Sequence, residues 1–246
     1  HIDIAYGFFT RKGGVSPKPF NKLNCGKSTK DKIKNVKKNI NLALKTLNLN
    51  DRTLVLGNQI HSNKTLIINN KFNQKKRYFV DGLISKNKNY ALGIITADCA
   101  PIFFYDSINK IIGAAHAGWR GCLNNICNST ISSMVKLGCR KKNIESIIGP
   151  CIKSRNYEVD KNLYSLFRKK DVSYTKFFEK KSNNNYNFSL MDILHFQLSK
   201  LRIGNIVVIN EDTYSNSLKY YSYRRSCHLQ LHNTGRMVNI IGFIER

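Results

Sequence analysis

The chain has 246 residues, of which 41 are Lys or Arg and 15 are Asp or Glu, so its formal net charge is +26. Hydrophobic residues make up 41% and aromatic residues 11%, enough apolar surface for a core, which excludes a disordered chain. No apolar run approaches the ~20 residues that a membrane-spanning helix needs. The length favours one domain, which we place at residues 1–246.

The first half of the chain predicts a strand, a helix and then a dense series of short strands. A strand is expected at residues 6–10 and a helix at 31–47, where apolar residues recur every three or four positions, with Thr29 as its N-cap. Five further segments are short and rich in β-branched or aromatic residues, which is typical of strands: 53–58, 65–68, 92–96, 102–105 and 110–116.

The second half continues as a mixture of helices and strands. The apolar pattern predicts helices at 122–137, 161–167 and 191–201, strands at 144–148 and 206–209, and a last apolar run at 237–244. The polar tract 180–187 is expected to be a surface loop. Because runs of strands outnumber strict alternation of strand and helix, the pattern favours an α+β fold with mixed β-sheets layered against helices.

Charge and cysteine content limit the possible partners and compartments. The positive field would attract phosphate or nucleic acid, but basic stretches such as residues 30–38 and 75–77 are typical of solvated faces. Nucleic-acid binding is therefore the weaker interpretation. The seven cysteines are odd in number and form no Cys-x-x-Cys pair, which favours a reducing, cytoplasmic setting.

Three segments place a metal-binding side chain where an apolar strand ends. They carry His61, Cys99 and His116 in that order. Two imidazoles and one thiolate suit zinc, or copper, with a fourth position free for water or substrate. The three residues are far apart in the chain, so spacing alone leaves a second interpretation open, in which Cys99 and His116 form a nucleophilic pair without metal.

Ordered motifs from residue 10 to residue 236 resemble those of the YfiH-like family, also called the laccase-domain or multicopper polyphenol oxidoreductase family. The matching segments are T-R-K-G-G-V-S at 10–16, N-C-G at 24–26, Q-I-H at 59–61, D-G-L-I-S at 81–85, T-A-D-C-A-P at 96–101, A-H-A-G-W-R-G at 115–121, I-G-P-C-I at 148–152, Y-E-V at 157–159, Y-R-R at 223–225 and T-G-R at 234–236. The chain departs from the family at Cys25, where an apolar residue is usual.

This resemblance implies a fold, a metal site and an activity. The fold would be YfiH-like, a layered α+β arrangement shared with a bacterial cytotoxic deamidase. His61, Cys99 and His116 would bind zinc and form the catalytic centre. The enzyme would be a purine nucleoside phosphorylase acting on adenosine, inosine, guanosine and methylthioadenosine, with adenosine deaminase activity. Its partners would be a small nucleoside and phosphate.

Several other polar residues are candidates for substrate contacts. Arginine forks match phosphate oxygens, so we expect phosphate binding by some of Arg11, Arg120, Arg224 and Arg225, although each could instead brace a turn. Asn24 and Asp81 are expected to contact substrate or phosphate, with turn formation as the other interpretation of Asp81. Asp98 is expected to orient a metal-bound histidine. Trp119 could stack on a base or pack in the core.

Three rival functions remain open from the sequence. A copper-dependent phenol oxidase of the laccase type needs a further copper cluster with many more histidines than the six present. A metal-free Cys–His hydrolase would keep its activity after chelation. A nucleic-acid-binding module would show strongly salt-dependent binding and no nucleoside turnover.

Overall fold

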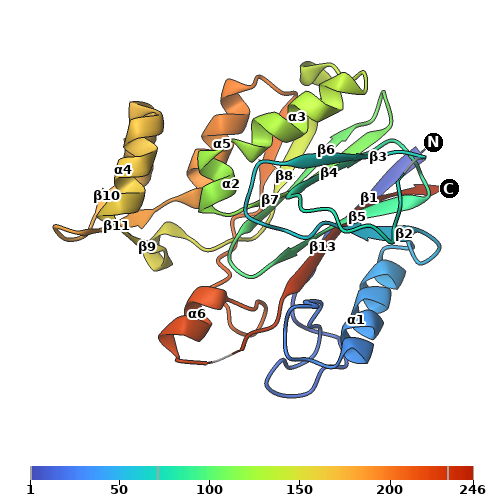
Figure 1. Ribbon diagram of the computed structural model, residues 1–246, viewed down its shortest axis with the longest axis horizontal. Helices are drawn as coiled ribbons and strands as arrows, with labels where there is room; N and C mark the ends of the chain where they lie inside the picture. Colours follow the sequence, from blue (N-terminus) through green and yellow to red (C-terminus); the bar gives the residue numbers. More distant parts are fainter. Residues whose placement is uncertain (1, 71, 232, 246) are drawn as a thin grey trace.

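The computed structural model describes residues 2–70, 72–231 and 233–245, which form two facing β-sheets with helices on their outer surfaces (Figure 1). The first sheet has the strand order β1 (Ile2–Phe8), β13 (Met237–Glu245), β5 (Tyr90–Thr96), β2 (Thr53–Leu56). The second has the order β12 (Asn205–Val208), β8 (Glu145–Ile148), β6 (Ala100–Asp106), β7 (Ile111–Ala117), β4 (Gly82–Ser85), β3 (Thr65–Ile68). Both sheets mix parallel and antiparallel pairs.

The two sheets pack face to face through a shared apolar core. Phe103 and Ile112 of the six-stranded sheet lie in one buried cluster with Leu92, Ile94 and Phe243 of the four-stranded sheet. β6 and β7 are buried along almost their whole length because helices cover the face that does not meet the other sheet, and both are continuous apolar runs in the sequence. Burying each large side chain contributes about 1.5–3 kcal/mol, and this burial fixes how the strands of the two sheets face each other.

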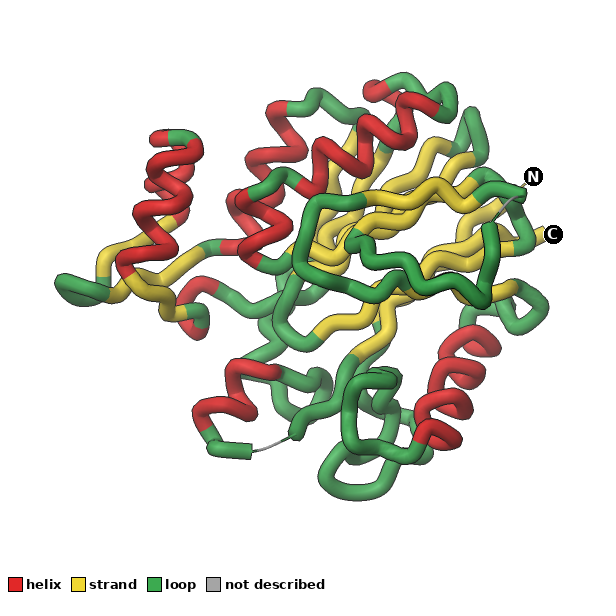
Figure 2. Tube along the Cα trace, in the orientation of Figure 1, coloured by secondary structure: helices red, strands yellow, loops and turns green. Residues whose placement is uncertain are grey.

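Helices complete the outer layers (Figure 2). The six-stranded sheet is covered by α2 (Trp119–Leu123), α3 (Ile126–Lys136) and α5 (Leu190–Lys200), whose apolar faces join its buried cluster. The four-stranded sheet is covered by α1 (Ile33–Thr46), whose buried face packs with residues of β13. Thr29 does not cap α1, since the hydroxyl donates to the carbonyl of Gly26 and Lys32 stands at the N-cap.

A small third sheet lies at one side of the molecule. Its strand order is β10 (Phe178–Lys180), β11 (Asn185–Phe188), β9 (Glu158–Asp160), and α4 (Lys161–Lys170) packs against it. The prediction of a loop at 180–187 is therefore wrong at its two ends, which belong to the paired strands β10 and β11 of a hairpin. The remaining helices are α6 (Tyr223–His228) and the short 3-10 helices Lys141–Asn143, Ser154–Asn156 and Val172–Phe177.

The structure confirms the α+β class with mixed sheets layered against helices. Of the expected elements, the helix at 122–137 is wrong in one respect, because Asn125 adopts the left-handed conformation and separates α2 from α3. The strands β4, β9, β10 and β11 and the helix α6 were not predicted. The six-stranded sheet contributes residues to two of the buried clusters. Within the described ranges, no helix is long and apolar enough to cross a membrane.

Candidate metal centre

The sheet topology brings three strand ends to one end of the β-sandwich. β2 runs parallel to β5, so both end at the same edge of their sheet. The turn after β5 carries Cys99 and leads directly into β6, whose first residues pair with the last residues of β7. His61 follows β2 and His116 is next to last in β7. The three side chains therefore meet where the two sheets join.

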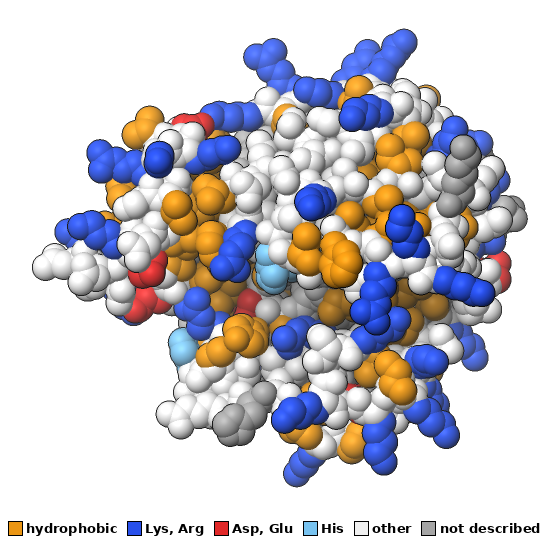
Figure 3. Space-filling model, viewed as in Figure 1, with side chains coloured by type: hydrophobic (Ala, Val, Ile, Leu, Met, Phe, Trp, Pro, Cys, Tyr) orange, Lys and Arg blue, Asp and Glu red, His pale blue; other side chains and the backbone are white. Residues whose placement is uncertain are grey.

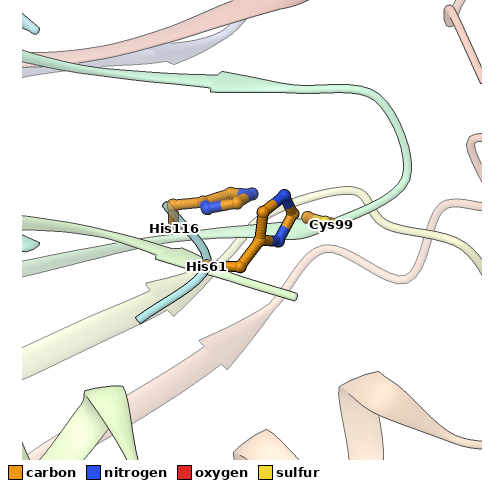
Figure 4. Close-up of side chains that lie close together, drawn as sticks. All are labelled: His61, Cys99 and His116. Carbon is orange, nitrogen blue, oxygen red and sulfur yellow. The ribbon is translucent and has the colours of Figure 1, made fainter. Parts of the chain in front are cut away.

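His61, Cys99 and His116 form one cluster, with the ligand atoms all within 4.8 Å of one another. Figure 4 shows the three side chains, carried by three separate segments, pointing toward one another. The two imidazole rings stand edge to face with centroids 4.8 Å apart. His116 is buried, Cys99 is half-buried and His61 is exposed, so the cluster opens to solvent on one side. This donor set fits zinc or copper.

The carboxylate of Asp81 orients this cluster. One oxygen lies 2.9 Å from Nδ1 of His116, which leaves the other ring nitrogen to face the cluster. The same carboxylate accepts hydrogen bonds from the backbone amides of Ile60, His61 and Ser62. It therefore fixes one histidine directly and the loop of the other through its backbone. A carboxylate partner of this kind is usual behind a metal-binding histidine.

The loop that carries His61 is held in two further ways. The side-chain amide of Gln59 both donates to and accepts from the backbone of Ile95 in β5, each at 2.8 Å, and so extends the sheet by one pairing. His61 itself has a φ of 58°, a left-handed conformation that is costly for a residue with a β-carbon. The hydrogen bonds of the loop amides to Asp81 and those of Gln59 with Ile95 maintain this conformation and present the imidazole to Cys99.

Gly118 provides the space beside the cluster. A β-carbon at this position would lie 2.9 Å from Sγ of Cys99 and 2.9 Å from Nδ1 of His61. Any side chain would therefore displace a ligand atom. The small residue after β7 is required by the cluster itself, and its backbone also begins α2.

The side chains of the cluster shift one another's pKa values. Burial alone would raise the pKa of the Cys99 thiol, but His116 and His61 outweigh burial and lower that pKa to about 6. Burial alone would lower the pKa of His116, whereas the Cys99 thiolate and Asp81 raise it to about 9. The lowered pKa favours the thiolate of Cys99, which is the form that binds metal, and the raised pKa favours a protonated His116 ring, which would lose its proton on metal binding.

The cluster lies in a cavity of about 740 Å³. Figure 3 shows a hollow on this face, with a histidine surface inside it and Lys and Arg side chains around it. Aromatic lining comes from Trp119, Tyr157 and Tyr223, and cationic lining comes from Lys27, Arg120, Arg224 and Arg236. A cavity of this size accepts a molecule as large as a nucleoside.

Two of the four arginines expected to bind phosphate lie outside this cavity. Arg11 and Arg225 line a second pocket of about 300 Å³ with Tyr221. The Arg11 guanidinium stacks 4.4 Å from the Tyr221 ring centroid and donates to a backbone carbonyl. The Arg225 guanidinium donates to the carbonyls of three residues, Thr213, Tyr214 and Tyr220. Their geometry supports bracing of loops, while Arg120 and Arg224 line the metal cavity.

Three expected roles change with the geometry. Asn24 is fully buried, and its side-chain nitrogen and oxygen are hydrogen-bonded to other residues of the chain, so it does not reach the cavity. Asp81 is also buried, and its oxygens are occupied by His116 and the loop amides, which leaves none for substrate. Asp98 does not orient a histidine, because its oxygens accept from Thr213, Ser222 and the Arg224 amide. Sequence reasoning missed Lys27, Gln59 and Arg236, although Gln59 and Arg236 lie in the matched motifs.

Comparison of the sequence with known proteins gives relatives along the whole chain. A purine nucleoside phosphorylase of Rickettsia conorii is 41% identical over 143 residues, which span 58% of this chain and 59% of that protein, less than two thirds of its length. The purine nucleoside phosphorylase YlmD of Bacillus subtilis is 31% identical over 253 aligned residues, covering 99% of this chain and 90% of that one.

Comparison of the fold agrees with the sequence matches. The crystal structure of YfiH from Bacillus licheniformis superposes with a TM-score of 0.89 at 28% identity, covering 97% of this chain and 92% of that chain. The structure of YlmD from Geobacillus stearothermophilus shares the fold with a TM-score of 0.88, covering 98% and 92%. The sequence pattern of the multi-copper polyphenol oxidoreductase laccase family matches residues 5–244, and the chain belongs to that family.

Proposed function

We propose that this chain is a zinc-dependent purine nucleoside phosphorylase that acts on adenosine, inosine, guanosine and methylthioadenosine, and that it also deaminates adenosine. The observation that carries the proposal is that the His61–Cys99–His116 cluster and several cationic side chains share one cavity. The activity named for YlmD of Bacillus subtilis, which aligns along nearly the whole chain, supports the same reaction class.

The residues present fit a zinc ion. Two imidazole nitrogens and one thiolate are borderline-soft donors, and a site with three protein ligands leaves a position open to substrate or water. Asp81 holds the ring of His116 in one orientation, and Gly118 keeps the space beside Cys99 and His61 free. When bound, the metal would supply a Lewis acid at this end of the cavity.

Phosphorolysis needs an anion site and an apolar platform beside that centre. A phosphate oxygen forms a bond to ribose C1′ while the bond from C1′ to purine N9 breaks, and the purine leaves with the electron pair and takes up a proton. The cationic side chains that line the cavity would neutralise charge on the phosphate. The rings of Trp119, Tyr157 and Tyr223 would pack on the purine and keep water from the reacting carbon.

A laccase-type oxidation is the weaker proposal despite the copper named in the family description. A multicopper oxidase needs a second, histidine-rich copper cluster for oxygen. In the parts of the chain that the structure describes, one group of three or more metal-binding side chains is found, and it is His61, Cys99 and His116. We also propose a reducing, cytoplasmic setting, because all seven cysteines are free thiols.

Product analysis tests the proposal. Purified protein with measured metal content is incubated with each of the four nucleosides, with and without orthophosphate, and the products are separated by chromatography. The proposal expects free base and ribose 1-phosphate only when phosphate is present, inosine from adenosine in both conditions, and loss of both activities after chelation with recovery on adding zinc. Oxidation of a phenol without any nucleoside product would overturn it.

A second candidate is a metal-free Cys–His hydrolase, favoured by one observation. Cys99 and His116 lie in one cluster, where each favours the charged form of the other, and Asp81 supports the histidine as the third member of such a triad would. Chelation separates the two candidates, because a hydrolase of this kind keeps its activity in the metal-free state and is inactivated by thiol alkylation.

A further inference from the structure

Two motif segments that the catalytic cluster does not use are joined beside the cavity. Oδ1 of Asn24 accepts hydrogen bonds from the backbone amides of Gly26, at 3.1 Å, and Arg236, at 2.9 Å. The amide of Cys25 donates to the carbonyl of Arg236 at 2.9 Å. The segment 24–26 therefore holds the backbone of residue 236 by two hydrogen bonds, one at its amide and one at its carbonyl.

The contact between Asn24 and Arg236 is hydrogen-bonded in turn to α1, the helix that covers the four-stranded sheet. Asn39 lies on the buried face of α1, and its side-chain amide donates to the carbonyl of Asn24 at 2.7 Å. Nδ2 of Asn24 donates to Thr29 and Asp31, at 2.9 and 3.0 Å. Every polar atom of the buried Asn24 side chain is thus engaged. A residue so placed positions its neighbours and has no free group for a substrate.

The side chain of Arg236 extends from its backbone contact with Asn24 into the cavity that holds the His61–Cys99–His116 cluster. A β-carbon on Gly26 would lie 2.6 Å from Cγ of Arg236, so the absence of a side chain there gives the arginine stem its path. One terminal nitrogen, NH1, donates to the carbonyls of Thr234 and Gly235. The guanidinium carbon lies 5.8 Å from the ring centroid of Tyr223. Arg236 and Cys99 line the same cavity.

The charges around this guanidinium do not balance. Lys27, Arg120, Arg224 and Arg236 line the cavity, and the acidic side chain among the lining residues is Asp98. The Asp98 carboxylate is occupied by Thr213, Ser222 and the Arg224 amide. No ion pair joins Arg236 to any carboxylate among the described side chains. A half-buried guanidinium without a carboxylate is suited to an anionic ligand that arrives from solvent.

We propose that Arg236, with Lys27 beside it, forms the orthophosphate subsite of this cavity, and that Asn24 is a positioning residue that holds Arg236 in place. The proposal rests on the phosphorylase function and deepens it. Arg236 differs from the other two cavity arginines because the segment 24–26 fixes both its backbone and the path of its side chain. Arg224 and Arg236 both donate to backbone carbonyls, whereas Arg120 is exposed and stacked 4.4 Å from the Trp119 ring centroid.

Kinetics with the two substrates varied separately test the subsite. Arg236→Met should raise the KM for orthophosphate by about tenfold or more, because a charge-assisted contact is lost, while the KM for inosine changes little. Lys27→Met, in an exposed loop, should raise it by a smaller factor. Adenosine deamination, which needs no phosphate, should fall by a smaller factor than phosphorolysis in both variants. Arg140→Met removes the same charge from an exposed residue remote from the cavity and should leave every constant unchanged.

Direct binding separates failure of the subsite from failure of the proposed function. Equilibrium dialysis of radiolabelled orthophosphate with the metal-loaded protein, without nucleoside, should show binding that Arg236→Met abolishes and Arg140→Met retains. If the native protein produces no ribose 1-phosphate but this pattern holds, the function is wrong and the anion subsite stands. Equal phosphate binding or equal phosphate KM in Arg236→Met and the native protein overturns the subsite.

Two further experiments address a variant that fails to fold and the chemical source of the phosphate group. Where Arg236→Met fails to fold, as judged by thermal melting and metal content, Lys27→Met alone must still raise the phosphate KM, or the proposal fails. Asn24→Ala should lower phosphate affinity without changing metal content, as a positioning residue would. AMP is offered in competition: if Arg236 governs AMP binding but not orthophosphate binding, the site serves a nucleotide and the proposal is overturned.

Discussion

The carboxylate of Asp81 and the imidazole of His116 lie 2.9 Å apart at Nδ1, and the amide of His116 also donates to the carbonyl of Asp81 at 2.8 Å. The two residues are thus joined through both side chain and backbone. This double contact follows from the antiparallel register of β4 and β7, in which Gly82 stands opposite Ala115. The orientation of the histidine is built into the pairing of two strands.

Asp81→Asn is expected to lower metal affinity by about 10–100-fold, the usual effect of losing the partner behind a metal-binding histidine. Nucleoside turnover should fall with metal content and recover in part at high zinc. Metal content after dialysis and turnover at graded zinc concentrations measure both. The matched control is Asp106→Asn, another buried aspartate, which caps the turn at the opposite end of β6. A similar loss of metal in both variants would contradict the specific role of Asp81.

Cys99→Ala is expected to abolish nucleoside turnover and reduce bound metal while leaving the fold largely intact. Cys99 faces the cavity, whereas Cys122 and Cys127 are fully buried in the apolar cluster beneath the helices. Cys122→Ala and Cys127→Ala should therefore keep metal and activity, with a stability loss from packing alone. Metal analysis of the three variants decides the matter. Full metal content with no activity in Cys99→Ala would favour the hydrolase.

Gly118→Ala is expected to lower metal content as strongly as loss of a ligand, because its β-carbon would lie 2.9 Å from both Cys99 Sγ and His61 Nδ1. Gly121→Ala is the control on the same helix, where the closest atom is 3.3 Å away and belongs to the Ser62 backbone. Metal titration of the two variants tests the difference. Native metal affinity in Gly118→Ala would show that the cluster can rearrange and that the glycine is not required.

Asp212→Asn is expected to change the pH dependence of stability. Burial alone would raise the pKa of Asp212, but hydrogen bonds from Ser215, Tyr214, Lys153 and Asn156 outweigh it and hold that pKa below its usual range. A carboxyl with a lowered pKa stabilises the folded state above the unfolded pKa of ~4 and loses this effect as pH falls through the folded value.

The free energy of unfolding of Asp212→Asn should accordingly be lower than native by about 1–3 kcal/mol at pH 7, with a smaller difference at pH 3. Urea titrations at the two pH values measure it. Asp51→Asn, at a side chain 61% exposed, should change stability by less than about 0.5 kcal/mol at either pH. A constant difference for Asp212→Asn from pH 7 to pH 3 would contradict this assignment.

The grouping of His61, Cys99 and His116 could be predicted because each lies at or just beyond the end of an apolar strand and because the matched family motifs contain all three; strand positions alone left a metal-free Cys–His pair open. The partner of His116 could not be predicted, because β4 was not predicted and only its register with β7 brings Asp81 to the histidine. The order of residues in the sequence therefore could not show whether Asp81 or Asp98 orients His116. One hydrogen bond that saturates the Asn24 side chain was hidden for the same reason, since it comes from the distant amide of Arg236.

Arg224 and Arg225 show a second limit of prediction from the sequence. They are adjacent in sequence and look equivalent as phosphate ligands. In the structure they belong to α6, where successive side chains point about 100° apart around the axis. Arg224 consequently enters the metal cavity and Arg225 enters the second pocket. Without a prediction of this short helix, the sequence could not separate them.

The place of β13 in its sheet has a consequence for biosynthesis. β13 lies between β1 and β5, so these two strands have no partner in common until residues 237–245 have left the ribosome. Arg236 directly precedes this strand, and its docking on Asn24 must wait for the same segment. His61, Cys99 and His116 are synthesised long before this segment. A nascent chain can thus contain all three residues of the cluster while the segment that places Arg236 in the cavity is still being translated.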